Sequence, residues 1–347
     1  KISNHITKKV ADSLQEIFTN DRSQFESKWD SLRIFVAYGM LTDDKFYKRA
    51  EKFNLWKNTD GKYFTEEEYI KLIETNQTDK DGNRIYLYTN DADQQYSYIE
   101  AAKSKGYDVL LMDGQLDIHL ASKIEQKNEK TRFVRVDADV IDKLIVKEDK
   151  TQHHLTPQQQ ETLSEVFKAQ TPKQGKTDYL IALDSLGADA FPVVITQNEF
   201  MRRMKEMSAM QGGMMSFYGD MPDSYTLVLN TDHPLIQGIL SKAETACAAE
   251  LAPKNADIED LRKKNEELET SHKDKKQEEI PEVEKDLLRT NRESIHQLEE
   301  EKTAIYQAFA ANEESVRQLI DLALLANNML KGEALSKFVK RSTQFIQ

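Results

Sequence analysis

The spacing of hydrophobic positions changes along the chain of 347 residues, and each change predicts a different kind of element. Residues 1–83 carry apolar positions at helical spacing, among them Ile6 and Val10, and are predicted to be mostly helical. Further on, short apolar runs predict strands at Arg84–Tyr88, Asp108–Met112 and Thr131–Val136, with helices between them at Asp93–Lys105 and Leu116–Ile124. This order predicts a βαβ unit with a right-handed crossover, so residues 84–147 are expected to form a small α/β domain.

Residues 148–347 are predicted to form a third segment with an α+β pattern. Strands are expected at Asp178–Leu183 and Ser224–Leu229, with helices between and after them. The expected fold class of the whole chain is therefore mixed, α+β and α/β. It combines a helical segment, the small βαβ subdomain, and an α+β domain that carries a charged insertion and two apolar terminal helices.

The charged insertion covers about residues 250–302. About half of its residues are charged, and its apolar residues keep the three- and four-residue spacing of coiled coils. Because Pro281 cannot lie in a regular helix interior, we expect a hairpin of two antiparallel helices that turn near this proline. Apolar positions are few, and Asn265, His272 and Asn291 interrupt them. The pattern predicts a marginal coiled coil that packs mainly on itself.

The last forty residues carry more apolar surface than one small domain needs. A helix from Val316 to Leu330 is apolar on two faces and must be covered on both. Gly332 ends it, and a second amphipathic helix follows. Two such helices favour a four-helix bundle built from two subunits, and the alternative is a terminal hairpin that folds onto its own domain. The expected dimer-interface residues are Leu319, Ile320, Leu322, Ala323, Leu324, Leu335, Phe338 and Val339.

Seven of the ten methionines fall between Met201 and Met221. On a helix from Asn198 to Met210 the methionines occupy one half of the circumference, and Arg202, Lys205 and Glu206 occupy the other. Methionine re-packs at little cost, so such a face suits a surface that meets many differently shaped apolar partners. The alternative is an ordinary core helix. The expected binding residues are Phe200, Met201, Met204, Met207, Met210, Met214, Met215, Phe217 and Tyr218.

Composition narrows the classes of function. Apolar residues make up 39% of the chain, no run approaches the roughly 18 apolar residues of a membrane span, and no signal-peptide pattern opens it. The single cysteine, Cys247, excludes an internal disulfide framework and predicts a cytoplasmic protein. A net charge of −12 disfavours non-specific binding to nucleic acid. Since the chain opens inside a predicted helix without an initiator methionine, we expect a piece of a longer protein.

No set of residues has the spacing of a catalytic, cofactor or metal site. Gly175-Lys176-Thr177 resembles the end of a phosphate-binding loop, but Gln170 stands where that loop needs a glycine. No glycine-rich turn follows the first strand of the βαβ unit, as dinucleotide binding requires. His153 and His154 lack further ligands at metal-binding spacing. We therefore expect no catalytic residue, metal or cofactor in this chain.

Several segments resemble, in order and spacing, the heat-shock protein 90 chaperones in their bacterial form. The segments that carry this resemblance are Asn58–Tyr63, Asn76–Asp79, Ile85–Tyr88, Val109–Met112, Asn230–Ile236 and Leu322–Ala326. The agreement extends over residues 1 to about 240 and again from about 305 to 347. The resemblance implies the C-terminal part of the family's middle domain, over residues 1–147, followed by its C-terminal dimerisation domain over residues 148–347.

The resemblance also implies a function. Members of this family are homodimeric stress-response chaperones that assist protein folding and hold non-native client proteins, and no nucleic-acid or membrane partner is expected. In that family an N-terminal domain binds ATP with Mg²⁺, and an arginine early in the middle domain reaches the nucleotide. Both would precede Lys1, so this chain is not expected to be an enzyme. The methionine helix falls where the family projects an amphipathic helix and loop into the dimer cleft.

The chain departs from the family pattern at two places. Ile118 and His119 stand where the bacterial family often has an acidic residue and a tryptophan in its client-binding face, so a smaller, titratable ring replaces a large aromatic one. The charged hairpin is longer than the family's usual connection. The alternative function is a structural or scaffolding dimer in which this hairpin recruits a fixed partner and the methionine face is core.

Overall fold

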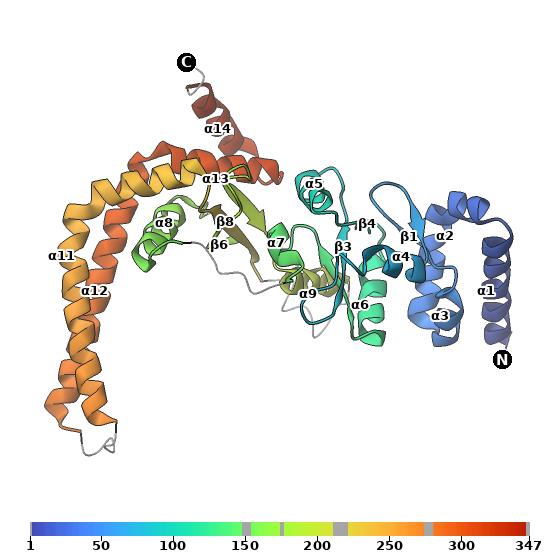
Figure 1. Cartoon of the computed structure of the whole chain (residues 1–347), viewed down its shortest axis with the longest axis horizontal. Helices are drawn as coiled ribbons and strands as arrows, with labels where there is room; N and C mark the ends of the chain where they lie inside the picture. Colours follow the sequence, from blue (N-terminus) through green and yellow to red (C-terminus); the bar gives the residue numbers. More distant parts are fainter. Residues whose placement is uncertain (1, 148–153, 174–176, 211–220, 274–279, 345–347) are drawn as a thin grey trace. The chain divides into compact units, whose positions relative to one another are not determined.

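The computed structural model describes residues 2–147, 154–173, 177–210, 221–273 and 280–344 (Figure 1). The chain divides into two compact units. The first unit consists of residues 1–151 and 196–224, and the second of residues 152–195 and 225–347. Residues 196–224 therefore belong with the first unit, whereas the sequence analysis placed them in the third segment. The contacts of the methionine helix, described below, explain this difference.

The first unit opens with three helices, α1 (Ile2–Asn20), α2 (Arg22–Thr42) and α3 (Asp44–Ala50). A short antiparallel hairpin follows, made of β1 (Trp56–Lys57) and β2 (Tyr63–Phe64), and then α4 (Glu66–Ile73). Gly61 has a φ of 77° in the turn of this hairpin, a conformation that favours glycine. The segment is mostly helical as predicted, and the short hairpin was not anticipated.

A three-stranded parallel sheet forms the rest of the first unit. Its strands are β3 (Arg84–Thr89), β4 (Val109–Leu111) and β5 (Thr131–Arg135), in the order β4-β3-β5. Both outer strands run parallel to β3, joined through α5 (Tyr96–Ser104) and α6 (Asp117–Lys127). The predicted βαβ unit is thus confirmed. The short α7 (Ile141–Leu144) follows β5, and α9 (Glu199–Met210) completes the unit.

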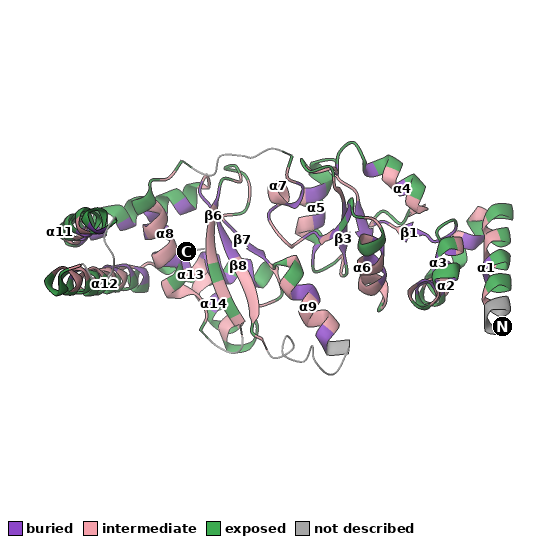
Figure 2. Cartoon of the chain, turned by 90° about the horizontal axis from the view of Figure 1, so that it is seen from below, coloured by how far each residue is buried: buried purple, intermediate pink, exposed green. Residues whose placement is uncertain are grey.

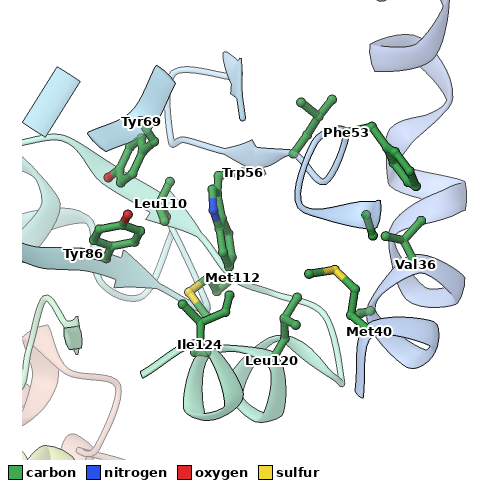
Figure 3. Close-up of a cluster of buried hydrophobic side chains, with 14 of the residues drawn as sticks. Val36, Met40, Phe53, Trp56, Tyr69, Tyr86, Leu110, Met112, Leu120 and Ile124 are labelled. Atoms are coloured by element: carbon green, nitrogen blue, oxygen red, sulfur yellow. The ribbon is translucent and has the colours of Figure 1, made fainter. Parts of the chain in front are cut away.

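Side chains of β3 alternate between two hydrophobic cores. Tyr86 and Tyr88 enter an aromatic core, where the rings of Tyr69 and Tyr86 lie 5.1 Å apart and those of Tyr86 and Phe133 4.8 Å apart. Figure 3 shows Tyr69, Trp56 and Leu110 gathered beside Tyr86 in this core. Ile85 and Leu87 enter an aliphatic core on the opposite face. A strand buried on both faces is the arrangement that parallel sheets favour, which is why its sequence is a continuous apolar run.

The second unit joins a small sheet to long helices. The sheet has the order β6-β8-β7, with β6 (Thr177–Asp184), β7 (Val193–Thr196) and β8 (Asp223–Asn230). The helices are α8 (Pro157–Gln170), α11 (Pro234–His272), α12 (Glu282–Asn312), α13 (Glu314–Ala326) and α14 (Gly332–Gln344). One hydrophobic core draws side chains from these helices and from β7 and β8.

The helices α11 and α12 form the predicted hairpin (Figure 1). Cross-pairs such as Arg262 with Glu299 and Arg292 with Glu269 show that the two helices run antiparallel. Pro281 immediately precedes α12, as expected for a residue that cannot continue a helix. The hairpin is longer than predicted, because α11 begins at Pro234 and runs through Pro253 without interruption.

Asn265, His272 and Asn291, which interrupt the apolar positions of the hairpin, lie in the seam between α11 and α12. Nδ2 of Asn291 donates to Oδ1 of Asn265 over 2.8 Å, and both residues are buried. His272 lies beside Glu284, with 2.5 Å between Nε2 and Oε2. The three- and four-residue apolar spacing also includes Val283 and Leu287 and so predicts both in the seam, but they are 79% and 47% exposed. Glu284 and Asn291 take the seam positions instead, because they continue the seven-residue spacing.

Candidate functional site

The methionine helix α9 is amphipathic as predicted, and its charged half faces the protein. Arg202 and Arg203 are only 5% and 9% exposed, whereas Met201, Met204 and Met207 are half-buried. None of these three methionines belongs to the hydrophobic cores formed by the described residues. Figure 2 shows this alternation of buried and intermediate positions along α9. The helix is therefore held by its charges, and its thioethers are not core.

Glu199 is the centre of the charged face. Its Oε1 accepts hydrogen bonds from Nε of Arg203 at 2.6 Å and Nη2 of Arg202 at 2.7 Å. The hydroxyl of Tyr88 on β3 donates to the same oxygen at 2.9 Å, and the backbone N–H of Arg135 donates to Oε2 at 3.1 Å. One carboxylate thus ties two arginines of its own helix to two strands of the sheet.

Arg203 extends this anchor to a helix and a strand. Its Nη1 donates to Glu125 on α6 at 2.8 Å, and its Nη2 donates to the carbonyl oxygen of Phe133 on β5 at 2.5 Å. Charges buried in this way persist only when they are paired and hydrogen-bonded. We call Tyr88, Glu125, Glu199, Arg202 and Arg203 the anchor cluster. The sequence analysis found none of its contacts, because the partners of α9 lie far away in the chain.

Protonation states in the anchor cluster follow from these contacts. Burial disfavours the charged form of Glu199, but Arg202 and Arg203 outweigh this effect and hold the pKa of Glu199 below its ordinary value. Burial raises the pKa of Tyr88, so its hydroxyl stays protonated and remains a donor. At neutral pH the carboxylate of Glu199 therefore lies between two guanidinium groups, and the phenol of Tyr88 donates to it.

A pocket of about 330 Å³ lies along one side of α9 within the first unit. Met201 and Met221 contribute apolar surface to it, and Arg135, Arg202 and Lys205 contribute positive charge. Nζ of Lys205 donates to Asp223 at 2.7 Å and to the carbonyl oxygen of Met221 at 3.0 Å. The pocket therefore combines thioether surface with N–H donors.

The remaining binding candidates are placed in different surroundings. Phe200 is 62% exposed beside the half-buried Met201. Ile118 on α6 is half-buried and packs against the aromatic core, and His119 is also half-buried. The side chain of Met210 and the residues Met214, Met215, Phe217 and Tyr218 lie outside the described part of the chain.

The terminal helices bury most of the expected dimer interface within their own unit. Leu319, Ile320, Ala323, Leu324 and Phe338 are buried in the core of the second unit, and Leu335 packs against it. Of the eight candidates, only Leu322 and Val339 are exposed, at 45% and 50%. The helix α13 is covered by α8 and α14, so much of its apolar surface needs no second subunit. Two-sided apolarity was therefore not sufficient evidence for a bundle of two subunits.

An ion pair that the sequence did not suggest joins α13 to α14. Asp321 is only 2% exposed, and its Oδ2 accepts from Nη2 of Arg341 at 2.6 Å. Arg317, one turn before Asp321 on α13, pairs with the same carboxylate and also donates to the carbonyl oxygen of Gln170 on α8. The ion pair of Asp321 with Arg341 therefore holds α14 against α13 in addition to the apolar packing between the two helices.

Among the described residues, no three side chains of His, Cys, Asp or Glu come together in a way that could hold a metal ion. None of the helices in this part of the chain has the length and apolarity needed to cross a membrane. His153, Gly175 and Lys176, which the sequence analysis considered, lie outside the described residues.

Comparison with known proteins agrees with the resemblance noted in the sequence. The family model described as Hsp90 protein matches residues 1–254. The chaperone protein HtpG of Bacteroides thetaiotaomicron is 55% identical over 346 residues, which cover 100% of this chain and 51% of that protein. HtpG of Porphyromonas gingivalis is 49% identical over 348 residues, which cover 100% of this chain and 50% of that protein.

The chain spans about half the length of the curated relatives that it matches. The family match ends at residue 254, where the hairpin leaves the core, whereas the relatives from Bacteroides and Porphyromonas align over the hairpin and the terminal helices as well. By the family match and by these relatives, the chain belongs to the Hsp90 family and is similar over its whole length to bacterial HtpG chaperones.

Proposed function

We propose that this chain is the part of a bacterial Hsp90 chaperone that holds non-native client proteins and forms a homodimer. The observation that supports client holding is the docking of α9. Glu199, Arg202 and Arg203 on its charged face are paired within the anchor cluster. Met201, Met204 and Met207 are half-buried and lie outside the hydrophobic cores. A rigid helix that presents flexible thioethers can adapt to apolar segments of many shapes.

In this proposal Phe200 and the α9 methionines take up apolar client side chains. The pocket beside Met201 adds a polar wall, in which Arg202 is paired with Glu206 and Lys205 with Asp223, next to the apolar surface that a client residue would contact. The residues Met214, Met215, Phe217 and Tyr218 continue the apolar sequence beyond the helix. Ile118 and His119 remain candidates for a second contact on α6.

ATP and Mg²⁺ belong, in this proposal, to the part of the relatives that this chain does not span. The chain itself would neither bind nor hydrolyse ATP, and the ATP-driven cycle would require the remaining half of a full-length protein. The protein would act in the bacterial cytoplasm. The competing function, a scaffold dimer whose hairpin recruits a fixed partner, is supported by the exposed Val283 and Leu287 on α12.

The test replaces Met201, Met204 and Met207 with serine. Each methionine that no longer packs on a client weakens binding by roughly 1 to 3 kcal/mol, so suppression of thermal aggregation of citrate synthase should fall at least tenfold in potency. The melting temperature should change little, because the three side chains lie outside the cores. The matched control is Phe35→Ser on α2, an apolar side chain that is 73% exposed in the same unit. Unchanged suppression in the triple variant would refute client holding by α9.

A further inference from the structure

We propose that the thioethers of Met201, Met204 and Met207 are a reversible oxidation site, and that their conversion to sulfoxides turns client holding off while the fold stays intact. This proposal rests on the proposed client-holding function of α9. The oxidant is a two-electron peroxide, and the reductant is a dithiol acting through methionine sulfoxide reductases.

The α9 thioethers are more accessible to peroxide than the thioethers in the aromatic core. The three α9 methionines are half-buried, whereas Met40 and Met112 are 1% and 3% exposed in the aromatic core. Peroxide must reach the sulfur atom to oxidise it, so the α9 thioethers should react before those of Met40 and Met112. The core methionines provide an internal reference in the same molecule.

The thiol of the chain is withdrawn from peroxide. The sequence holds one cysteine, Cys247, which is 3% exposed in the core of the second unit. Burial raises the pKa of its thiol, which reduces the thiolate that reacts with peroxide. Peroxide therefore meets thioethers on α9 before it meets a reactive thiol.

The thioether sulfur attacks one oxygen of hydrogen peroxide, the O–O bond breaks, an S–O bond forms, and water leaves. Sulfur loses two electrons, which the peroxide gains. Two thiols reverse the step, since they become a disulfide and take up the oxygen as water. The sulfoxide is polar and accepts hydrogen bonds, so an apolar client segment loses its complementary surface. Around Met201, the new oxygen would lie in a pocket that Arg202 and Lys205 also line.

The side chains that are oxidised are not the ones that hold α9 in place. The anchor cluster holds α9 through Glu199, Arg202 and Arg203, none of which is oxidised by peroxide. The thioethers project from the other half of the helix, outside the hydrophobic cores. Oxidation therefore changes the surface that a client meets without removing the contacts that hold the helix in place.

The experiment treats the chain with hydrogen peroxide, maps each methionine by peptide mass spectrometry, and measures suppression of citrate synthase aggregation. We expect Met201, Met204 and Met207 to oxidise at least tenfold faster than Met40 and Met112, with a parallel loss of suppression. Methionine sulfoxide reductases A and B with dithiothreitol should restore it. Oxidation of α9 at the rate of the core methionines would overturn the proposal.

Two variants isolate the site. With Met201, Met204 and Met207 replaced by leucine, which is apolar and inert to peroxide, the suppression that the variant shows before treatment should not fall on treatment. With Met210, Met214 and Met215 replaced by leucine instead, suppression should remain sensitive to peroxide. A loss of suppression in the first variant equal to that of the unaltered chain would overturn the proposal. The serine variant described above tests client holding by itself. If α9 does not hold clients, that variant suppresses aggregation normally, whatever the pattern of oxidation.

Discussion

Arg203 on α9 and Glu125 on α6 are 78 positions apart in the chain, yet Nη1 of Arg203 donates to Oε2 of Glu125 over 2.8 Å. Both side chains are largely withdrawn from solvent, at 11% and 18% exposure. Such a pair is costly to break, because removal of one partner leaves the other charge buried and uncompensated. The relationship explains how a helix with three methionines on its open side can remain fixed.

The first prediction is therefore that Arg203→Leu releases α9. Loss of the guanidinium leaves Glu125 without this partner and should cost about 3 to 5 kcal/mol, confined to the docking of the helix. Hydrogen exchange over residues 199–208 should accelerate strongly. Arg262→Leu is the control, since the pair of Arg262 with Glu299 on the hairpin is 64% and 45% exposed and should contribute at most about 1 kcal/mol. Equal exchange in the two variants would contradict the anchoring role.

The second prediction concerns pH. Glu66 on α4 is half-buried, and its carboxylate accepts from Nε1 of Trp56 at 2.7 Å and from the hydroxyl of Tyr86 at 2.6 Å. Burial raises the pKa of Glu66, and these hydrogen bonds oppose the rise only in part. The folded state thus holds this proton more tightly than the unfolded chain does. Its contribution to stability is present below the unfolded pKa of about 4.3 and is lost as pH rises through the folded pKa.

Replacement of Glu66 by glutamine tests this sign. A glutamine can still accept from Trp56 and can donate to the Tyr86 oxygen, but it does not ionise. The melting temperature of Glu66→Gln relative to the unaltered chain should therefore increase as pH rises from about 4 to 7. Glu67→Gln, at a neighbouring carboxylate that is 81% exposed, should give no such trend. A difference that stays constant with pH would show that Glu66 does not titrate in this range.

The sheet of the first unit was predictable, and the orientation of α9 was not. The run from Ile85 to Leu87 is apolar at every position because β3 is buried on both faces, so its sequence reports its environment directly. The sequence of an amphipathic helix defines an apolar face and a charged face, but it does not determine which of them is buried. Charged faces usually meet solvent, and α9 is an exception because Glu199, Arg202 and Arg203 satisfy one another and distant partners. Tyr88, for example, precedes Glu199 by 111 positions.

The terminal helices illustrate the same limit. Their apolar positions are evident in the sequence, but sequence cannot distinguish burial within one unit from burial between two subunits. The buried Asp321 was also unpredictable, because its partner Arg341 lies on a different helix and both residues are polar in sequence. By contrast, Asn265 and Asn291 interrupt the apolar spacing of the hairpin, so the sequence indicates polar residues in its seam, although the same spacing is misleading at Val283 and Leu287.

The third prediction tests the proposed dimer with exposed residues. Leu322→Glu combined with Val339→Glu places two charges on the part of the terminal helices that is open in one subunit. If a second subunit covers these positions, the variant should sediment as a monomer and keep its helical circular dichroism. Leu324→Glu is the contrasting change, because Leu324 is 2% exposed and a buried unpaired charge there should unfold the second unit. A double variant that sediments like the unaltered dimer would exclude this face, and an unaltered chain that is monomeric at micromolar concentration would end the dimer proposal.

The last prediction asks whether the hairpin is separable. Near its base, Nζ of Lys302 pairs with Glu161 on α8 at 2.7 Å, and Leu251 and Tyr306 belong to the core of the second unit. Beyond that base the two helices contact mainly each other, and their seam contains the polar pairs Asn265 with Asn291 and His272 with Glu284. Deletion of residues 254–300 with a short glycine bridge should therefore leave Leu251 and Lys302 in place. We expect the melting temperature of the rest of the chain to change by less than about 3 °C, which corresponds to roughly 1 kcal/mol.

The same deletion separates the two proposed functions. A client-holding chain should still dimerise and suppress citrate synthase aggregation without the hairpin, because α9 and the terminal helices are untouched. A scaffold that recruits a fixed partner should lose that partner, and Val283→Ser with Leu287→Ser should reproduce the loss in an intact hairpin, since both side chains are exposed there. Insoluble or monomeric protein after deletion would mean that the hairpin is part of the core, despite the polar pairs in its seam.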